Sequence, residues 1–164
     1  MKAIIRIYKS QDLSKVVQLW YKTWHSSFPD IQHPQPYRLW EKRFRDELVC
    51  RGEVWVADVK YQVVGFIVVF RTDNSKNTGE LNQIFVDPIF QNKGIGTLLL
   101  NKAKTICPQG LKLTALQTNK KACCFYTKHG FVPGEMSINK INQQPNIEYI
   151  WRPLGTNVYK SSMS

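Results

Sequence analysis

The segment FVDPIFQNKGIGTLLL, residues 85–100, contains the sharpest change of pattern in the sequence. A β-rich run ends at the Asp-Pro pair of residues 87–88, and a helical apolar repeat begins within Gln91-x-x-Gly94-x-Gly96. The first amide groups of a helix have no partner inside the helix, and glycines let an anion approach them closely. Such a turn can bind phosphate, although an ordinary strand-to-helix turn would use the same glycines.

Two other classes of glycine loop do not fit this turn. The pattern Gly-x-x-x-x-Gly-Lys-Ser/Thr is absent, which argues against a nucleotide triphosphatase. Only two glycines of a dinucleotide-binding fingerprint are present, and they lie too late in the chain for a first βαβ unit. Both classes are therefore excluded. Lys93 adds a cation next to the glycines, which favours an anionic ligand of another kind.

A second segment, NKKACCFYTKHGF at residues 119–131, predicts a helix with a defined start and end. Asn119 is a good N-cap, and Gly130 is a good residue to follow the last turn. Tyr126 lies seven residues after Asn119 and four after Ala122, so all three share one helix face. The tyrosine hydroxyl would then face whatever Asn119 faces, although aromatic residues at this spacing are more often core residues.

Hydrophobic periodicity predicts further strands and helices on both sides of these segments. Strands are expected at residues 2–8, 53–58, 62–71, 80–86, 111–117, 131–138 and 147–152, and helices at residues 13–25, 37–48, 94–106 and 119–129. Ser10 or Asp12 can cap the first helix, Gly65 can form a bulge or a close approach, and residues 73–79 form a polar loop. This order of elements implies an α/β fold, with a mixed central β-sheet flanked by α-helices.

The length of 164 residues fits one domain with a sizeable apolar core. We expect a single domain over residues 1–154 and a flexible C-terminal tail over residues 155–164. The longest apolar stretch, residues 63–70, is too short to cross a bilayer, and the first residues lack the core of a signal peptide. A cytoplasmic protein with no membrane partner is expected.

Charge and cysteine content narrow the classes of ligand. The formal net charge of +11 favours anionic partners, which could be nucleic acid, a membrane surface or a phosphorylated cofactor. The four cysteines form no Cys-x-x-Cys pair and have no histidine at ligand spacing. Free thiols are therefore expected, and no metal.

Together the two segments resemble the GNAT superfamily, the Gcn5-related N-acetyltransferases. Residues 86–96, with Val-Asp-Pro followed by Gln91-x-x-Gly94-x-Gly96, look like motif A of that family, and residues 119–131 look like its motif B. The resemblance covers residues 80–131, whereas the flanking elements match by order alone. It implies the GNAT fold of acyl-CoA N-acyltransferases and transfer of an acetyl group from acetyl-CoA to a primary amine.

The resemblance also implies a cofactor-binding set. Its members are Phe85, Val86, Gln91, Asn92, Lys93, Gly94, Ile95, Gly96, Thr97, Asn119 and Tyr126. The main chain at Phe85 and Val86 would pair with the pantetheine arm like an added strand, and the amides of residues 91–97 would hold the pyrophosphate. Asn119 would help to hold the pantetheine, and the Tyr126 hydroxyl would protonate the departing thiolate.

A general base is also expected, because an ammonium has no lone pair with which to attack. The resemblance implies Glu80, at the start of the motif A strand; an exposed glutamate at a strand end is the alternative. His25 and His129 are weaker candidates, since the first would more often cover core surface and the second has a helix-end position typical of a structural role. The aromatic residues that would bound the acceptor pocket are Trp20, Trp24, Tyr37 and Trp40.

The expected reaction is a single-step transfer, with the oxyanion met by a main-chain N–H near Val86. The acceptor would be a small-molecule or peptide amine, and the last strands would serve for a homodimer as they commonly do in the family. A domain that senses acyl-CoA without turnover is one alternative. A basic RNA- or DNA-binding protein is another, but the aromatic-basic signature of the common nucleic-acid modules is absent from the sequence.

Overall fold

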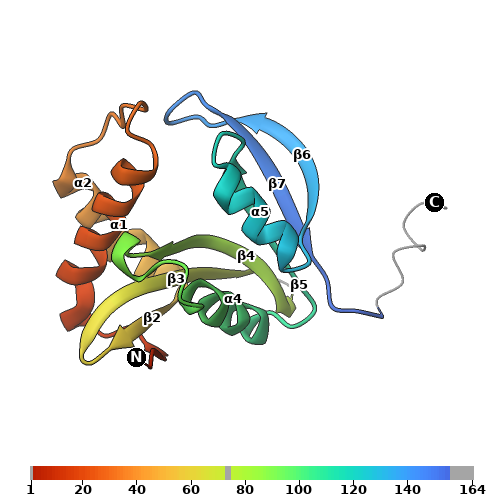
Figure 1. The fold of residues 1–164 in the computed structure, drawn as a ribbon, viewed down its shortest axis with the longest axis horizontal. Helices are drawn as coiled ribbons and strands as arrows, with labels where there is room; N and C mark the ends of the chain where they lie inside the picture. The colour runs from red at the N-terminus through yellow and green to blue at the C-terminus, as the bar shows by residue number, and fades with distance from the viewer. Residues whose placement is uncertain (1, 73–74, 156–164) are drawn as a thin grey trace.

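The computed structural model of the chain describes residues 2–72 and 75–155. These residues form a seven-stranded sheet with the strand order β1-β2-β3-β4-β5-β7-β6 (Figure 1). Neighbouring strands are antiparallel, except for β4 and β5, which are parallel. The strands are β1 (Ile4–Ile7), β2 (Glu53–Val59), β3 (Gln62–Thr72), β4 (Ser75–Val86), β5 (Gly110–Leu116), β6 (Val132–Ile138) and β7 (Pro145–Trp151). The predicted mixed sheet is confirmed.

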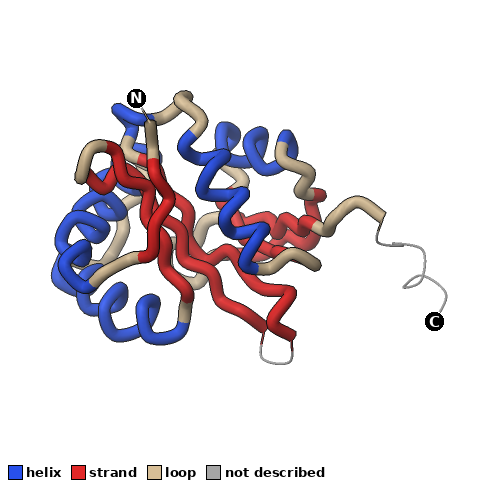
Figure 2. The backbone as a smooth tube through the Cα atoms, turned by 90° about the horizontal axis from the view of Figure 1, so that it is seen from below, coloured by secondary structure: helices blue, strands red, loops and turns tan. Residues whose placement is uncertain are grey.

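Helices cover both faces of this sheet (Figure 2). They are α1 (Leu13–Ser27), α2 (Tyr37–Arg43), α3 (Val49–Arg51), α4 (Ile95–Ile106) and α5 (Lys120–Lys128), with short helical segments at η1 (Ser10–Asp12), η2 (Phe44–Leu48) and η3 (Pro88–Phe90). The side chains of α1 and α2 belong to one buried cluster, and those of α4 and α5 to another. The helix predicted at residues 37–48 is confirmed, although its second half, η2, has π-helical geometry.

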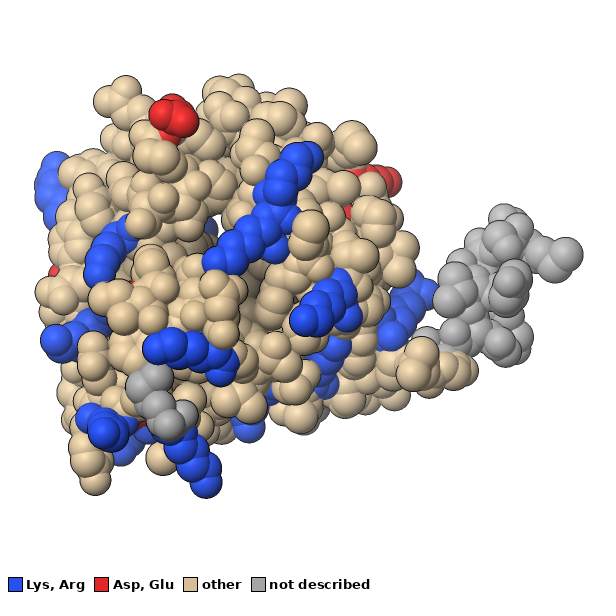
Figure 3. All heavy atoms as spheres, viewed as in Figure 1, with Lys and Arg blue, Asp and Glu red and all other residues tan. Residues whose placement is uncertain are grey.

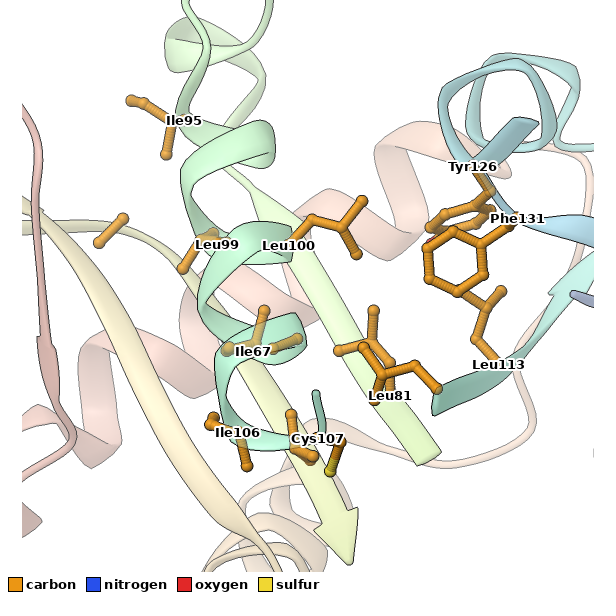
Figure 4. Packing of buried hydrophobic residues seen from close by; sticks show 14 of the residues in the cluster. Ile67, Leu81, Ile95, Leu99, Leu100, Ile106, Cys107, Leu113, Tyr126 and Phe131 are labelled. Atoms are coloured by element: carbon orange, nitrogen blue, oxygen red, sulfur yellow. The ribbon is translucent and has the colours of Figure 1, made fainter. Parts of the chain in front are cut away.

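Helix α4 packs on its face of the sheet through a row of leucines. Leu99 and Leu100 are fully buried and lie in one cluster with Ile67 of β3 and Leu81 of β4 (Figure 4). Burial of each such side chain contributes about 1.5–3 kcal/mol to stability. Tyr126 of α5 belongs to the same cluster, so this core also fixes the position of α5.

Helix α1 packs on the opposite face through the stripe that its periodicity predicts. Val16 and Trp20 are buried there with Phe44 of η2 and Phe66 of β3. The ring of Trp20 meets that of Trp40 edge-on, with centroids 4.7 Å apart. These contacts hold α1 and α2 together against the sheet.

Strands β4 and β5 lie side by side over only a short distance. Residues 78–80 pair with residues 110–112, and the pairing ends there. Beyond that point β4 stays paired with β3 as far as Val86, and β5 stays paired with β7 as far as Leu116. The sheet is therefore split at the carboxyl ends of two parallel strands, which is a common position for a ligand site in α/β proteins.

Gly65 lies at a close approach of β3 to β4. A Cβ atom at this position would lie 2.9 Å from the Phe85 carbonyl oxygen, which is too close for any other residue. The ladder between β2 and β3 also shifts register between Ala57 and Asp58, beside Gly65. The close approach predicted as one alternative for Gly65 is confirmed, and the register shift leaves the neighbouring Val64 as the extra residue.

The start of β4 differs from the prediction. A polar loop was expected over residues 73–79, but the strand begins at Ser75, and Gly79 pairs with Arg71 of β3. Residues in this part of the hairpin are mostly polar, so they show no alternation of apolar side chains that would predict a strand. Residues 73–74 of the expected loop and 156–164 of the expected tail lie outside the described residues. In the part of the chain that the structure describes, no helix is both long and apolar enough to cross a bilayer.

Candidate active site

A large cavity lies at the split between β4 and β5. Its volume is about 790 Å³, and its walls come from α1, α2, β4, β5, the start of α4, α5 and the loop between β6 and β7. This size is within the range of small-molecule sites. The molecule is hollowed near the centre of the face shown in Figure 3, and lysine and arginine side chains surround the hollow.

The turn between β4 and α4 exposes free amides to this cavity. Asn92 has a φ of 60° and Gly94 a φ of 82°, so the chain passes twice through the left-handed region within three residues. No side chain caps the first turn of α4, and a Cβ at Gly94 would have nothing within 4 Å. The turn is therefore an open concavity of backbone N–H groups at a helix N-terminus, where an anion is favoured.

The side chain of Gln91 holds this turn in place. Its Nε2 donates to the Val86 carbonyl at 2.9 Å, and its Oε1 accepts from Lys121 Nζ of α5 at 2.8 Å. The turn is thus tied to both sides of the split. The Gln91 backbone amide, which was expected to hold a phosphate, donates to the Pro88 carbonyl oxygen at 3.4 Å, and no local pattern of the sequence indicates the bridging role of the side chain.

The pairing of β4 with β3 decides which main-chain groups face the split. The Asp87 amide donates to the Val64 carbonyl at 2.8 Å, so the pair Gly65 and Val86 turns its main-chain groups away from the ladder. By the same alternation Ile84 faces the split, whereas Phe85 faces β3. The expected added strand would therefore meet the main chain of Ile84 and Val86, whereas Phe85 lines the cavity and stacks its ring on that of Phe66.

Helix α5 forms the opposite wall. Asn119 caps it, since its Oδ1 accepts from the Ala122 amide at 3.2 Å, and Gly130 follows it with a φ of 88°, as predicted. Asn119, Ala122 and Tyr126 all line the cavity, which confirms that they share one face. Tyr126 is almost fully buried beside Phe131 (Figure 4), and this burial, reinforced by the nearby Cys123, raises the pKa of its hydroxyl.

Glu80 lies where β4 and β5 begin to separate. It forms the last pair of the parallel ladder, with Lys112, and it lines the cavity. Asn82 Nδ2 donates to Glu80 Oε1 at 3.1 Å, which orients the carboxylate and leaves its second oxygen for another partner. Glu80 is half-buried, in contrast to the exposed strand end that was the alternative.

The far end of the cavity is walled by aromatic side chains of α1 and α2. Trp20, Trp24 and Trp40 line it, as expected from their helices, but Tyr37 does not. His33, from the loop between the helices, joins them, and no sequence signal pointed to it. Thr23 of α1 also lines the cavity, and its buried hydroxyl has no hydrogen-bond partner among the described residues.

The expected cofactor residues meet at one cavity with two exceptions. Those that line it are Phe85, Val86, Gln91, Asn92, Gly94, Gly96, Thr97, Asn119 and Tyr126. The Ile95 side chain is buried in the core instead, and Lys93 is exposed, with its ammonium 5.6 Å from the centroid of the Phe90 ring. Only the main chain of these two residues could then face a ligand in the turn.

The two candidate histidines differ in position. His25 is not among the residues that line the cavity, and its Nδ1 lies 2.7 Å from the Tyr21 carbonyl oxygen. His129 lines the cavity, and its Nε2 lies 3.2 Å from Thr97 Oγ1. Burial and the neighbouring lysines lower the pKa of His129, so its ring is neutral at pH 7.

The four cysteines are free, as expected. Cys123 of α5 is half-buried, whereas Cys124 is exposed. The reason is that Cys124 lies on the outer face of α5, one position from the face that packs on β5 and β7. Among the described residues, no cluster of three His, Cys, Asp or Glu side chains could hold a metal ion.

Comparison with known proteins gives several relatives that are named N-acetyltransferases. The chain is 29% identical over 142 residues to an uncharacterized N-acetyltransferase, MJ1207, of Methanocaldococcus jannaschii, a match that covers 80% of this chain and 62% of that protein. It is 25% identical over 142 residues to the peptidyl-lysine N-acetyltransferase YjaB of Salmonella typhimurium, covering 85% of this chain and 90% of YjaB.

Solved structures show the same fold. The PaiA N-acetyltransferase of Thermoplasma acidophilum, solved in complex with coenzyme A, superposes with a TM-score of 0.73 at 19% identity, over 93% of this chain and 100% of that one. The model of the Acetyltransferase (GNAT) family matches residues 13–131, which include the split sheet, the glycine turn and helix α5. The chain therefore belongs to the GNAT family of acetyltransferases.

Proposed function

We propose that the protein transfers the acetyl group of acetyl-CoA to a primary amine by direct attack. One observation carries this proposal: Glu80, the turn at Gly94 and Tyr126 come from separate parts of the chain and line the same cavity. The coenzyme A bound to the related PaiA fold supports the choice of an acyl-CoA. The N-acetyltransferase names of the sequence relatives support an amine acceptor.

The residues present fit coenzyme A in three respects. Free amides of residues 92–97 suit a pyrophosphate, and the absence of a Cβ at Gly94 leaves room for it. Lys121 and Lys128 line the same cavity and would add positive charge near the phosphates. The outward main-chain groups of Ile84 and Val86 suit a pantetheine arm, which carries amide groups of its own. Asn119 would contact the arm from α5.

The chain's own groups would then act on the thioester. The Val86 amide would donate to the carbonyl oxygen as negative charge develops on it. The Tyr126 hydroxyl would protonate the departing thiolate, and its raised pKa keeps it protonated at neutral pH. Acetyl-CoA, when bound, would supply the acetyl group as a reactive thioester.

Glu80 would prepare the acceptor. An amine is mostly protonated at pH 7 and must lose a proton before it attacks the carbonyl carbon. Glu80 would accept this proton directly or through a water molecule, with Asn82 holding its other oxygen. The ammonium proton thus moves to Glu80, which later releases it to solvent. After attack the nitrogen carries one further proton, and the thiolate leaves as it takes a proton from Tyr126. The proton lost from nitrogen then returns Tyr126 to its hydroxyl form, so the products are the amide, the CoA thiol and one proton.

The proposal includes a single catalytic domain over residues 1–154, a cytoplasmic location and a small-molecule or peptide amine as acceptor. Peptidyl-lysine, the acceptor in the name of the YjaB relative, is one member of this class. A homodimer through the last strands is part of the same proposal, supported by the exposed edge strand β6.

Thiol release from acetyl-CoA, measured with panels of amines, tests this function. Release that depends on both the protein and an amine, with the acetylated amine identified by mass spectrometry, would support an enzyme. Binding of acetyl-CoA without release for any amine class would instead support a domain that senses acyl-CoA. Salt-sensitive binding of nucleic acid, without stabilisation by CoA, would contradict both.

A further inference from the structure

The acceptor end of the cavity has an aromatic wall, formed by Trp20, Trp24, His33 and Trp40. The His33 ring centroid lies 5.0 Å from that of Trp24 and 4.5 Å from that of Trp40. The rings of Trp20 and Trp40 meet edge-on, so the group is held by its own contacts and by the core beneath it. Flat rings in fixed positions favour a flat partner, because aromatic pairs gain energy beyond the area that they bury.

Thr23 provides a single unpaired polar group beside this wall. Its side chain is 3% exposed, and its hydroxyl has no hydrogen-bond partner among the described residues. A threonine inside a helix ordinarily donates to a carbonyl three or four residues earlier, and here it does not. Buried hydroxyl groups are almost always paired, and Thr23 lines the cavity, so this hydroxyl is available to a ligand there.

The charges of the cavity disfavour a polycationic acceptor. Among the described residues that line the cavity, Glu80 is the only one with a carboxylate, whereas Arg43, Lys121 and Lys128 are cationic. A polyamine or a lysine-rich peptide needs several negative groups, and it would meet repulsion here. Burial, and to a lesser degree the nearby His25 and Arg43, lowers the pKa of His33, which favours the uncharged form of this ring in the aromatic wall.

We infer that the acceptor is a small monoamine with a flat aromatic body, which packs on the aromatic wall and exchanges a hydrogen bond with the Thr23 hydroxyl. The amine would reach Glu80, and the body would lie against Trp24, His33 and Trp40. This inference rests on the proposed function, since it assigns the acceptor of that same reaction. Arylalkylamines that carry a ring hydroxyl have this chemistry.

The test compares acetylation of five amines at saturating acetyl-CoA. Tyramine has all the required features, phenethylamine lacks the hydroxyl, and 2-cyclohexylethylamine lacks the aromatic ring. Spermidine and a tripeptide of three lysines represent the disfavoured polycationic classes. We expect kcat/KM for tyramine to exceed that for spermidine and for the peptide by at least about tenfold. Equal or better use of spermidine or the peptide would overturn the inference while leaving the transferase function intact.

A substitution at Thr23 tests the hydrogen bond. Thr23→Val keeps the shape and removes the hydroxyl, so KM for tyramine should rise roughly five- to tenfold while KM for phenethylamine is unchanged. Thr23→Ser should restore the value for tyramine. Thr105→Val, at an exposed position of α4, is the matched control and should change neither. Equal effects of Thr23→Val on both amines, or no effect on either, would contradict the assignment.

A second variant covers the case in which Thr23→Val does not fold. Trp24→Leu removes a half-buried ring of the aromatic wall, and it should reduce the preference for tyramine over 2-cyclohexylethylamine to nearly one. An unchanged preference would count against the aromatic body. Calorimetric titration of the wild type and of each variant with acetyl-CoA distinguishes this inference from the proposed function. A variant that binds acetyl-CoA normally but loses its acceptor selectivity would support the inference. Failure of the wild type to bind acetyl-CoA would contradict the proposed function itself.

Discussion

The side-chain amide of Gln91 donates to the Val86 carbonyl at 2.9 Å, which ties the turn before α4 to the last residue of β4. The other end of the same side chain accepts from Lys121 at 2.8 Å. One glutamine thus connects the three elements around the proposed cofactor site. The Val86 carbonyl is held in this way, and the register of β4 with β3 directs the Val86 amide to the split before any ligand arrives, which is the arrangement that electrostatic catalysis needs.

Replacement of Gln91 tests this connection. Gln91→Ala should weaken binding of CoA by about tenfold, because the turn loses both of its side-chain ties and part of its pre-organisation. The measurement is calorimetric titration with CoA. Gln109→Ala, at an exposed position after α4, is the matched control and should bind CoA like the wild type. An unchanged affinity of Gln91→Ala for CoA would show that the turn keeps its conformation without the Gln91 side chain.

Gly94 should be intolerant of a side chain for a reason apart from packing. Gly94→Ala forces an L-residue into a φ of 82°, which costs about 1–2 kcal/mol, and its methyl group would enter the space above the free amides. We expect lower stability together with loss of CoA binding. Gly130→Ala carries the same strain, at a φ of 88°, but lies outside the cavity. Gly130→Ala should lose similar stability in urea melts and keep its affinity for CoA. If both variants lost affinity for CoA, the cause would be misfolding and not the position of Gly94 in the site.

Tyr126→Phe tests the proposed proton donor. Without the hydroxyl, kcat should fall by about a hundredfold, while affinity for acetyl-CoA stays within a fewfold of wild type. Tyr149→Phe, whose ring centroid lies 5.8 Å from that of Tyr126 but which does not line the cavity, should keep its activity. Equal rates for Tyr126→Phe and wild type would exclude the hydroxyl as the donor.

The pH profile offers an independent check on Tyr126. Burial, with Cys123 as a lesser cause, raises the pKa of Tyr126 above the usual value of about 10. The hydroxyl therefore stays protonated throughout the physiological range, and its ionisation should cause no fall in kcat below about pH 10. An alkaline limb between about pH 7 and 9 that disappears in Tyr126→Phe would contradict this account.

Glu80→Gln tests the proposed base. The amide keeps the size and the contact with Asn82 but cannot accept a proton, so kcat/KM for the amine should fall by about a hundredfold or more at pH 7. The deficit should shrink as the pH rises, since more of the free amine is then already unprotonated. Glu135→Gln, on exposed β6, serves as the control. A constant deficit at every pH would assign Glu80 a structural role.

A prediction on stability concerns Asp12, far from the site. Hydrogen bonds from Arg6, then one from the Lys9 amide, lower the pKa of this buried carboxyl. A lowered folded pKa gives stability that is complete above the unfolded value of about 4 and is lost as the pH falls through the folded value. Asp12→Asn should cost about 1–3 kcal/mol in urea melts near pH 7, and less near pH 3. Asp46→Asn, at an exposed pair, should change little at either pH.

Local signals in the sequence predicted the order of elements and the ends of the two decisive helices. Gly94 and Gly130 both adopt the positive φ that only glycine adopts without strain, and Asn119 makes the side-chain cap that its residue type favours. Caps and left-handed glycines depend on a few neighbouring residues, so they can be predicted from the local sequence.

The remaining features arise from contacts between distant segments. Thr23 and His33 carry no pattern of their own, and only the packing of α1 and α2 brings them to the cavity. The start of β4 is set by its pairing with β3 rather than by its polar composition. In the same way the direction of the Val86 amide follows from the register with Gly65, which no local pattern states.

Calorimetric titration of the purified protein with CoA and with acetyl-CoA, at low and at physiological salt, tests the central claim most directly. If the free amides of residues 92–97 hold a diphosphate, both compounds should bind one to one, with a Kd on the order of micromolar that rises as salt is added. Absence of any heat of association at low salt, from a protein whose melting shows that it is folded, would contradict the account.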